Sequence, residues 1–191
     1  DLYDGDWRDH KTGLFFASQM TRLREAGIRA VVARGNHDAA SRITRSLSLP
    51  NNVVDLPVNH PDTVVLDDIG VAVHGRGFAD PGVKENVVPG YPAVRRDLYN
   101  IGMLHTSAGR AGHDNYAPCS LQDLLALGYQ YWALGHIHRR EVLSQDPWVC
   151  FPGNLQGRHI RETGPKGCLL VTVENDVARV EERDFELVRW E

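Results

Sequence analysis

The sequence predicts an α/β protein of the α+β kind, with two sheets in a β-sandwich flanked by helices. The early part of the chain combines a helical pattern, a short buried strand and a second helical pattern, which is typical of α/β folds. The later apolar runs are short and rich in β-branched residues, and Pro, Asn or Gly separates them. Because helical patterns become rare along the chain, two sheets with helices outside them fit better than a doubly wound sheet. We expect residues 1–191 to form one domain.

The composition is that of a protein with a substantial core. The 191 residues include 21 Lys+Arg and 25 Asp+Glu, for a formal net charge of −4, and 42% are hydrophobic. This excludes a disordered tail, a collagen-like fibre and a strongly basic nucleic-acid binder. The three cysteines are widely spaced and no apolar run approaches the roughly 18–20 residues of a membrane span. We therefore expect a cytoplasmic protein with no membrane partner.

The first elements follow from apolar spacing. Residues 13–26 carry apolar side chains at helical intervals, and Gly27 stands where a helix ends. Residues 28–33 form a short apolar run that predicts a buried strand. The polar turn at 34–38 follows this strand, and a second helix is expected over 39–47.

The rest of the chain is rich in predicted strands. They are expected at 52–56, 63–66, 71–74, 99–104, 129–134, 140–143, 149–151, 168–173 and 177–183. Residues 75–92 predict a loop with one helical turn, because Gly and Pro are frequent there. Ser120 is expected to cap a short helix over 121–127, with Asp123 in its first turn. Residues 174–176 predict a hairpin between the last two strands.

Three of the predicted strands end in polar segments that contain histidine. The segments are Asn36-His37-Asp38, His105 and His136-Ile137-His138. Because the carboxyl ends of strands line the ligand crevice in open α/β sheets, we expect these side chains to converge. Neutral imidazole with Asn and carboxylate oxygens is a ligand set for Mn²⁺, Fe²⁺ or Zn²⁺. A lone histidine is more often an ordinary surface or core residue, but the ordered set predicts a metal site.

The ordered set resembles the later motifs of the calcineurin-like metallophosphoesterases, GD-x-x-D, GNH-[DE], a lone His and G-H-x-H. The counterparts in this sequence are Asp1-Leu2-Tyr3-Asp4, Gly35-Asn36-His37-Asp38, His105 and Gly135-His136-Ile137-His138. The resemblance implies a metallophosphoesterase domain and a metal-dependent phosphodiesterase activity. It also implies two divalent metal ions, with Mn²⁺ as the first choice and Fe²⁺, Zn²⁺ or Mg²⁺ as alternatives.

The resemblance assigns a role to each matching position. Asp1 corresponds to the carboxylate that bridges both metal ions. His37 corresponds to the catalytic histidine that faces the substrate, and Asp4 to the residue that orients it. The other implied ligands are Asn36, His105 and His136 for one metal ion and His138 for the second. Two ions roughly 3.5–4 Å apart can activate a hydroxide for in-line displacement at phosphorus, and a histidine outside the ligand set can protonate the leaving oxygen.

One motif of the family is missing from the sequence. The family opens with a strand that ends in D-x-H, whose Asp and His bind the same metal ion as His138, and no D-x-H precedes Asp1. Asp9-His10 is out of place and lacks the spacer. We expect that the sequence begins part-way through the domain, without its first strand; a domain that truly lacks this strand is the alternative. In either case, these residues alone are expected to hold at most one well-ordered ion.

A second resemblance concerns a subgroup, the bacterial DNA-repair exonucleases of the SbcD and YhaO type. It rests on residues 104–107, 112–118, 131–136 and 151–158. It implies DNA as the substrate and an SbcC-like ATPase as a partner. Two other functions stay open: the same chemistry on a phosphoprotein or a small nucleotide, and a non-catalytic binding scaffold of the same fold.

Local cations are the candidates for contact with a substrate phosphate, because the net charge gives no general attraction to DNA. Arg139 directly follows the His-x-His motif, and Arg158 lies in one of the resembling segments. His74 ends another predicted strand and is a third candidate. The alternatives are solvated surface charge for the two arginines and a core position for His74.

Overall fold

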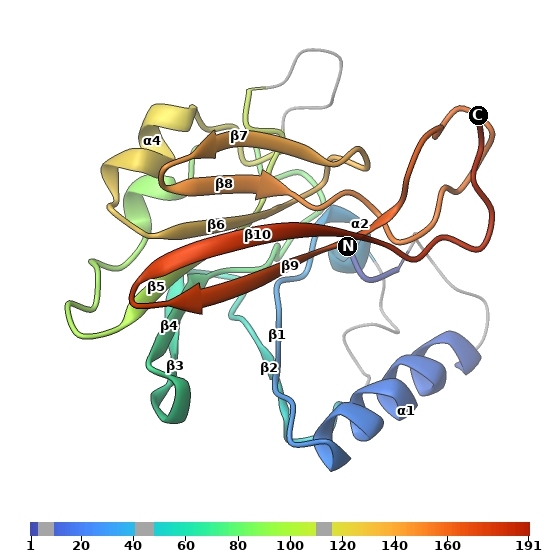
Figure 1. The fold of residues 1–191 in the computed structure, drawn as a ribbon, viewed down its shortest axis with the longest axis horizontal. Helices are drawn as coiled ribbons and strands as arrows, with labels where there is room; N and C mark the ends of the chain where they lie inside the picture. The colour runs from blue at the N-terminus through green and yellow to red at the C-terminus, as the bar shows by residue number, and fades with distance from the viewer. Residues whose placement is uncertain (4–9, 41–47, 110–115) are drawn as a thin grey trace.

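A six-stranded mixed sheet forms the centre of the molecule in the computed structural model, which describes residues 1–3, 10–40, 48–109 and 116–191 (Figure 1). Its strands, in spatial order, are β3 (Asp62–Leu66), β4 (Val71–Gly75), β5 (Tyr99–His105), β6 (Tyr131–Gly135), β8 (Trp148–Phe151) and β7 (Glu141–Gln145). The neighbours from β4 to β8 run parallel, and the edge strands β3 and β7 pair antiparallel with β4 and β8. The mixed α/β class predicted from the sequence is confirmed.

A long hairpin covers one face of this sheet. It consists of β9 (Gly167–Glu174) and β10 (Val177–Asp184), which pair antiparallel along their whole length. Its apolar side chains pack on a cluster of buried residues from the central sheet, Tyr99, Tyr131 and Cys150. Asn175 and Asp176 join the two strands with φ values of 51° and 63°, as a tight hairpin turn requires. The hairpin expected at 174–176 is therefore confirmed.

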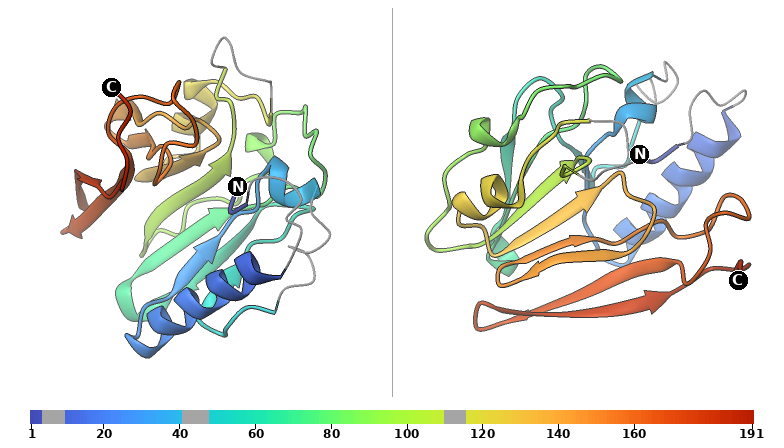
Figure 2. Two further views of the ribbon diagram at one scale, coloured as in Figure 1. Left: turned by 90° about the vertical axis from the view of Figure 1, so that its right-hand side faces the viewer. Right: turned by 90° about the horizontal axis from the view of Figure 1, so that it is seen from above.

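The other face of the sheet carries the larger core and the helix α4 (Leu121–Ala126). Trp132 is fully buried there and its indole N–H donates to the carbonyl of Leu124, 3.2 Å away. Ser120 caps α4 as predicted: its hydroxyl accepts from the Asp123 N–H at 3.1 Å, and the Asp123 carboxylate accepts from the Ser120 N–H at 2.7 Å. Figure 2 shows α4 and the β9–β10 hairpin on opposite sides of the sheet.

A parallel strand pair stands beside the central sheet. It consists of β1 (Ala30–Val32) and β2 (Val53–Asp55). Backbone hydrogen bonds tie it to the segment after β4, from Phe78 N to Arg34 O at 2.8 Å and from Gly77 N to Pro57 O at 3.0 Å. The end of β1 is thereby held near the carboxyl ends of the central strands.

Of the remaining helices, one agrees with the prediction and one begins at a different residue. The helix α1 (Lys11–Glu25) agrees with the prediction for residues 13–26. The second helix, α2 (Asn36–Ala40), begins three residues earlier than expected, because the polar turn after β1 is itself its first helical turn; residues 41–47 lie outside the described part. Two short 3-10 helices complete the elements, η1 (Asp67–Ile69) and η2 (Val88–Gly90). No helix within the described ranges is long and apolar enough to cross a membrane.

Candidate metal-dependent active site

The parallel pairing of β5 and β6 places two of the predicted histidines side by side. His105, the last residue of β5, is paired in register with Gly135, the last residue of β6. His136 follows directly, and the ring centroids of His105 and His136 lie 5.1 Å apart in an edge-to-face arrangement. The backbone register of β5 and β6 therefore brings these two histidines together, as the sequence predicted.

The beginning of α2 meets the same strand ends. The Nε2 atom of His105 lies 2.9 Å from Oδ1 of Asn36 and 3.4 Å from Oδ2 of Asp1. The backbone N–H of His37 donates to Oδ1 of Asp1 at 2.9 Å. Gly35 makes this approach possible, because a Cβ at that position would overlap the Asp1 carboxylate and lie 2.6 Å from Cε1 of His105.

Asp38 holds the chain around Asp1 in place. Its side chain is fully buried and accepts three backbone N–H groups, from Leu2 at 2.8 Å, Tyr3 at 3.2 Å and Gly35 at 3.1 Å. The Asp38 carboxylate thus joins residues 1–3 to the first turn of α2. The sequence places Asp38 inside a motif but offers no signal for its link to residues 2 and 3, because these backbone groups are more than 30 positions away.

His105 is held in a form that suits a ligand. Burial lowers its pKa well below the ordinary value for histidine, and the nearby imidazoles of His136, His37 and His138 lower it further. The ring is therefore neutral at physiological pH and keeps a lone pair, which is the state that binds metal ions.

His136 has an unusual backbone. Its φ of 102° lies in a region that residues with a side chain rarely adopt, at a cost on the order of 1–3 kcal/mol. The Tyr116 ring contacts the His136 ring edge-to-face at 5.2 Å between centroids. Such strain is kept where the surrounding structure requires one orientation, and here it sets the direction of the His136 side chain next to His105.

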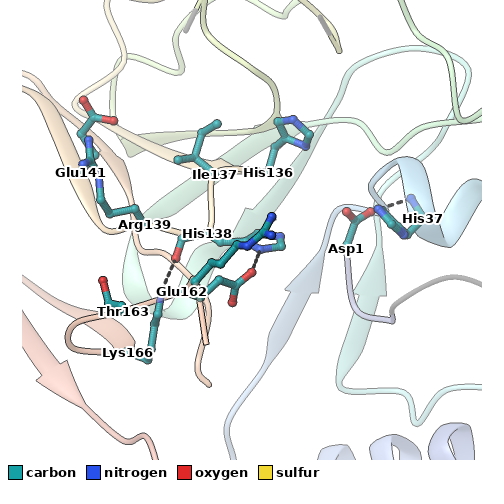
Figure 3. Close-up of a pocket in the computed structure, with 11 residues that line it drawn as sticks. Asp1, His37, His136, Ile137, His138, Arg139, Glu141, Glu162, Thr163 and Lys166 are labelled. Atoms are coloured by element: carbon teal, nitrogen blue, oxygen red, sulfur yellow. Dashed lines mark hydrogen bonds and ion pairs between the residues drawn. The ribbon is translucent and has the colours of Figure 1, made fainter. Parts of the chain in front are cut away.

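His138 lies on the other side of the pocket from Asp1 and His37 (Figure 3). Its Nδ1 atom is 2.8 Å from Oε1 of Glu162, in the connection between β8 and β9. The sequence predicts that His138 and Asp1 serve the same ion, and the contact with Glu162 at Nδ1 leaves Nε2 of His138 for that role. Glu162 is a residue of the site that the sequence did not predict.

The Glu162 carboxylate is strongly held in its ionised form. Burial raises its pKa, but hydrogen bonds from the His138 ring, the Arg158 N–H and the Asn154 amide outweigh burial and lower the pKa to about 2. The donor–acceptor distances are 2.8 Å for Nδ2 of Asn154 and 2.9 Å for the Arg158 N–H. Glu162 therefore carries a negative charge at every physiological pH.

The histidines line an open cavity of about 870 Å³ with charges of both signs. Its walls contain the carboxylates of Asp1, Glu141 and Glu162 and the cations Arg139, Arg161 and Lys166. A second cavity of about 430 Å³ shares Asp1, His37, His136 and His138 and is bordered by Arg158. Both arginines proposed from the sequence thus lie at the cavities that contain the predicted ligands.

One predicted site residue lies elsewhere, and another lies outside the described part of the chain. His74 is fully buried, with its ring nitrogens 2.8 Å from the Thr63 hydroxyl and 2.9 Å from Oδ1 of Asn100, and it stacks on Tyr129. A substrate contact for His74 is therefore wrong, because Tyr129, Thr63 and Asn100 enclose the ring and it belongs to the core. Asp4 lies outside the described residues, as do residues 112–115 of the second resembling segment.

The donors at the strand ends fit one ion better than two. Asp1, Asn36 and His105 bring a carboxylate, an amide oxygen and a neutral imidazole to one point, with His136 adjacent, and these donors suit Mn²⁺ or a related ion. Within the described part of the chain, no three His, Cys, Asp or Glu side chains are close enough to hold an ion by themselves.

The structure thus combines a mixed sheet under a β-hairpin with His, Asn and carboxylate donors near the carboxyl ends of its strands. No family model matches the chain. The chain is 39% identical, over an alignment of 196 residues, to a Bacillus subtilis (strain 168) protein named "uncharacterized metallophosphoesterase YhaO". The alignment covers 100% of this chain and 48% of that protein, so the chain spans about half the length of this curated relative. The similarity supports the metallophosphoesterase superfamily.

Proposed function

We propose that this chain is the metal-binding part of a phosphodiesterase that acts on DNA, as a repair exonuclease does. The observation that carries the proposal is the position of Nε2 of His105, which lies 2.9 Å from Oδ1 of Asn36 and 3.4 Å from Oδ2 of Asp1, next to His37. Three separate parts of the sequence supply these donors at one point. In this structure an Nε2–H donor on His105 accounts for the contact with the two oxygens, and a metal ion bound at this point would take the place of that proton.

The ligand roles follow from this geometry and from the motifs. Asp1, Asn36, His105 and His136 would hold one ion, and His138 would contribute to a second ion together with Asp1. A divalent ion in such a site, for which Mn²⁺ is our first choice, supplies activation of water and neutralises charge at phosphorus. The protein supplies the positions: Gly35 lets Asp1 approach His105, and the strain at His136 directs its ring.

His37 is the residue to which we assign proton transfer. It lines the cavity, and its backbone N–H orients the Asp1 carboxylate. An imidazole at this position can stabilise charge on the phosphoryl group and give a proton to the leaving oxygen, an effect that contributes typically ~10²–10⁴-fold. Asp4 remains the proposed partner that orients His37.

Two exposed arginines beside the ligands favour an anionic polymer as the substrate. Arg139 lines the larger cavity and Arg158 borders the smaller one, so a nucleic-acid strand could place phosphates at these two cations. We therefore favour DNA over a phosphoprotein or a small nucleotide. An SbcC-like ATPase belongs to this proposal as the partner of the complete protein.

The test compares three substrates with the complete protein in Mn²⁺: bis(4-nitrophenyl) phosphate, linear DNA and a phosphoserine peptide. We expect hydrolysis of the diester and of DNA, and loss of both activities after chelation. Release of phosphate from the peptide without cleavage of DNA would support the second substrate class instead. If the metal content after Mn²⁺ treatment were nil, the metal-dependent function would be wrong and a binding scaffold would take its place.

A further inference from the structure

We propose that Glu162 is the positioning residue of His138: its carboxylate fixes the imidazole tautomer that leaves Nε2 as the nitrogen available to a metal ion. The inference rests on the proposed function, in which His138 is a metal ligand. No motif in the sequence pairs these two residues, which are 24 positions apart. The connection between β8 and β9 brings them together.

In the contact between the two side chains, His138 is the hydrogen-bond donor and Glu162 is the acceptor. An ionised carboxylate only accepts hydrogen bonds, so the Nδ1 atom of His138, 2.8 Å from Oε1 of Glu162, must carry the proton. A neutral imidazole protonated at Nδ1 has its lone pair at Nε2. Metal-binding histidines commonly donate their second ring N–H to a carboxylate or a carbonyl in this way.

Glu162 is itself held in one orientation. Its side chain is only 13% exposed, and its second oxygen, Oε2, accepts from Nδ2 of Asn154 at 2.8 Å and from the Arg158 N–H at 2.9 Å. Oε2 already receives two donors, and Oε1 faces His138 at 2.8 Å, with Nε2 of His159 further away at 3.8 Å. The carboxylate therefore differs from a surface partner that turns between several contacts.

The backbone of His138 is held by the same connection. Its carbonyl accepts from the Lys166 ammonium at 3.2 Å and from the Asn154 N–H at 3.2 Å, and Lys166 is buried. Gly153 permits this approach, because a Cβ there would lie 3.0 Å from the His138 carbonyl and its φ is 77°. Residues 153–166 thus hold both the ring and the main chain of His138.

A Glu162→Gln variant gives a sharp test, since two N–H donors converge on Oε2. The amide oxygen of Gln must take that place, and its NH₂ group then faces Nδ1 of His138. A neutral ring accepts from this NH₂ group only in the opposite tautomer, with the proton on Nε2. We therefore expect the substitution to reverse the tautomer and to block the nitrogen that binds metal.

The experiment uses the complete protein labelled with ¹⁵N-histidine, free of metal, at a pH above the ordinary histidine value of ~6.5. Ring ¹⁵N shifts, assigned with a His138→Gln variant, should report the Nδ1–H tautomer in the wild type and the Nε2–H tautomer in Glu162→Gln. Calorimetric titration with Mn²⁺ should show affinity lower by about 10–100-fold in the variant. Glu182→Gln is the matched control, because Glu182 is 63% exposed and contacts Arg140 outside the cavity.

Unchanged tautomer and unchanged Mn²⁺ affinity in Glu162→Gln would overturn the role of Glu162 while the proposed function stood. Absence of Mn²⁺ binding by the wild-type protein would overturn the proposed function, and the role of Glu162 with it. If the Gln variant does not fold, Glu162→Ala replaces it; a mixture of His138 tautomers is then expected, and a retained Nδ1–H tautomer would contradict the proposal.

Discussion

The Nε2 atom of His105 lies 2.9 Å from Oδ1 of Asn36, although 69 positions separate the two residues in the sequence. One stands at the end of a central strand and the other at the start of a short helix beside the sheet. Their meeting joins two motifs that the sequence shows only as separate segments. The predictions below depend on this junction and on the groups around it.

Asn36→Ala should weaken Mn²⁺ binding more than tenfold, because the described acidic and imidazole side chains do not form a cluster of three without the amide. Calorimetric titration measures the effect, and circular dichroism checks the fold. The exposed Asn175, in the hairpin turn far from the site in sequence and structure, provides Asn175→Gly as a control. Equal affinity in Asn36→Ala and the wild type would remove Asn36 from the ligand set.

His37→Ala should lower the hydrolysis rate by about 10²–10⁴-fold and leave Mn²⁺ affinity close to that of the wild type. The reason is that the His37 backbone, which the substitution keeps, is the part that contacts Asp1. Turnover of bis(4-nitrophenyl) phosphate and calorimetric titration separate the two effects. A parallel loss of metal would instead make His37 a ligand.

Gly35→Ala should abolish Mn²⁺ binding, because the added methyl group overlaps the Asp1 carboxylate and crowds His105. Overpacking of this kind costs typically ~1–3 kcal/mol in the free energy of unfolding. Gly82→Ala is the matched control, since a Cβ at Gly82 meets no atom within 4 Å. Denaturant unfolding and metal titration of both variants check the prediction, and a Gly35→Ala protein that binds Mn²⁺ normally would contradict it.

The stability of the metal-free protein should fall in acid partly through Glu162. Its pKa is about 2 in the folded protein against an ordinary 4.5, so the unfolded chain binds the proton first as the pH falls. The stabilisation is complete above pH 4.5 and is lost as the pH approaches 2. Urea unfolding at several pH values should give a shallower acid dependence for Glu162→Gln, whereas identical slopes would show that the carboxylate does not contribute.

Ser120→Ala should lower the free energy of unfolding by about 1 kcal/mol and leave hydrolysis unchanged, because the hydroxyl caps α4 on the face away from the β9–β10 hairpin. Thermal and urea unfolding measure the first effect and steady-state kinetics the second. A change in turnover would contradict this prediction and would mean that α4 influences the site through its contact with Trp132.

The strand pattern and the strand ends were predictable because each depends on local sequence. Parallel strands that end in histidine place those residues at one edge of a sheet, so the proximity of His105 and His136 follows from pattern alone. The capping of α4 by Ser120 is similarly local. Residue spacing also predicted the helix α1. It did not predict that Leu14 and Phe15 on this helix are 62% and 67% exposed, because the spacing of apolar residues indicates a helix but not which elements cover it.

The missed features depend on contacts between distant segments. Glu162 approaches His138 only through the path of the β8–β9 connection, and Asp38 acts on backbone groups that carry no sequence signal. His74 stands at a strand end like His105 but is enclosed by Tyr129, Thr63 and Asn100. Position at the end of a strand therefore does not by itself distinguish a ligand from a core residue.

The pairing of β5 with β6 also makes the positions of the site histidines depend on side-chain packing in the core. Gly102 leaves the gap that the Trp132 ring fills, and the same ladder, three residues further on, pairs His105 with Gly135. A slip of β6 by one position would turn Trp132 toward the opposite face and carry His136 away from His105. The packing of Trp132 against Gly102 thus fixes the register that sets the spacing of the His105 and His136 rings. Substitutions around Gly102 can therefore disable the site although they make no contact with its residues.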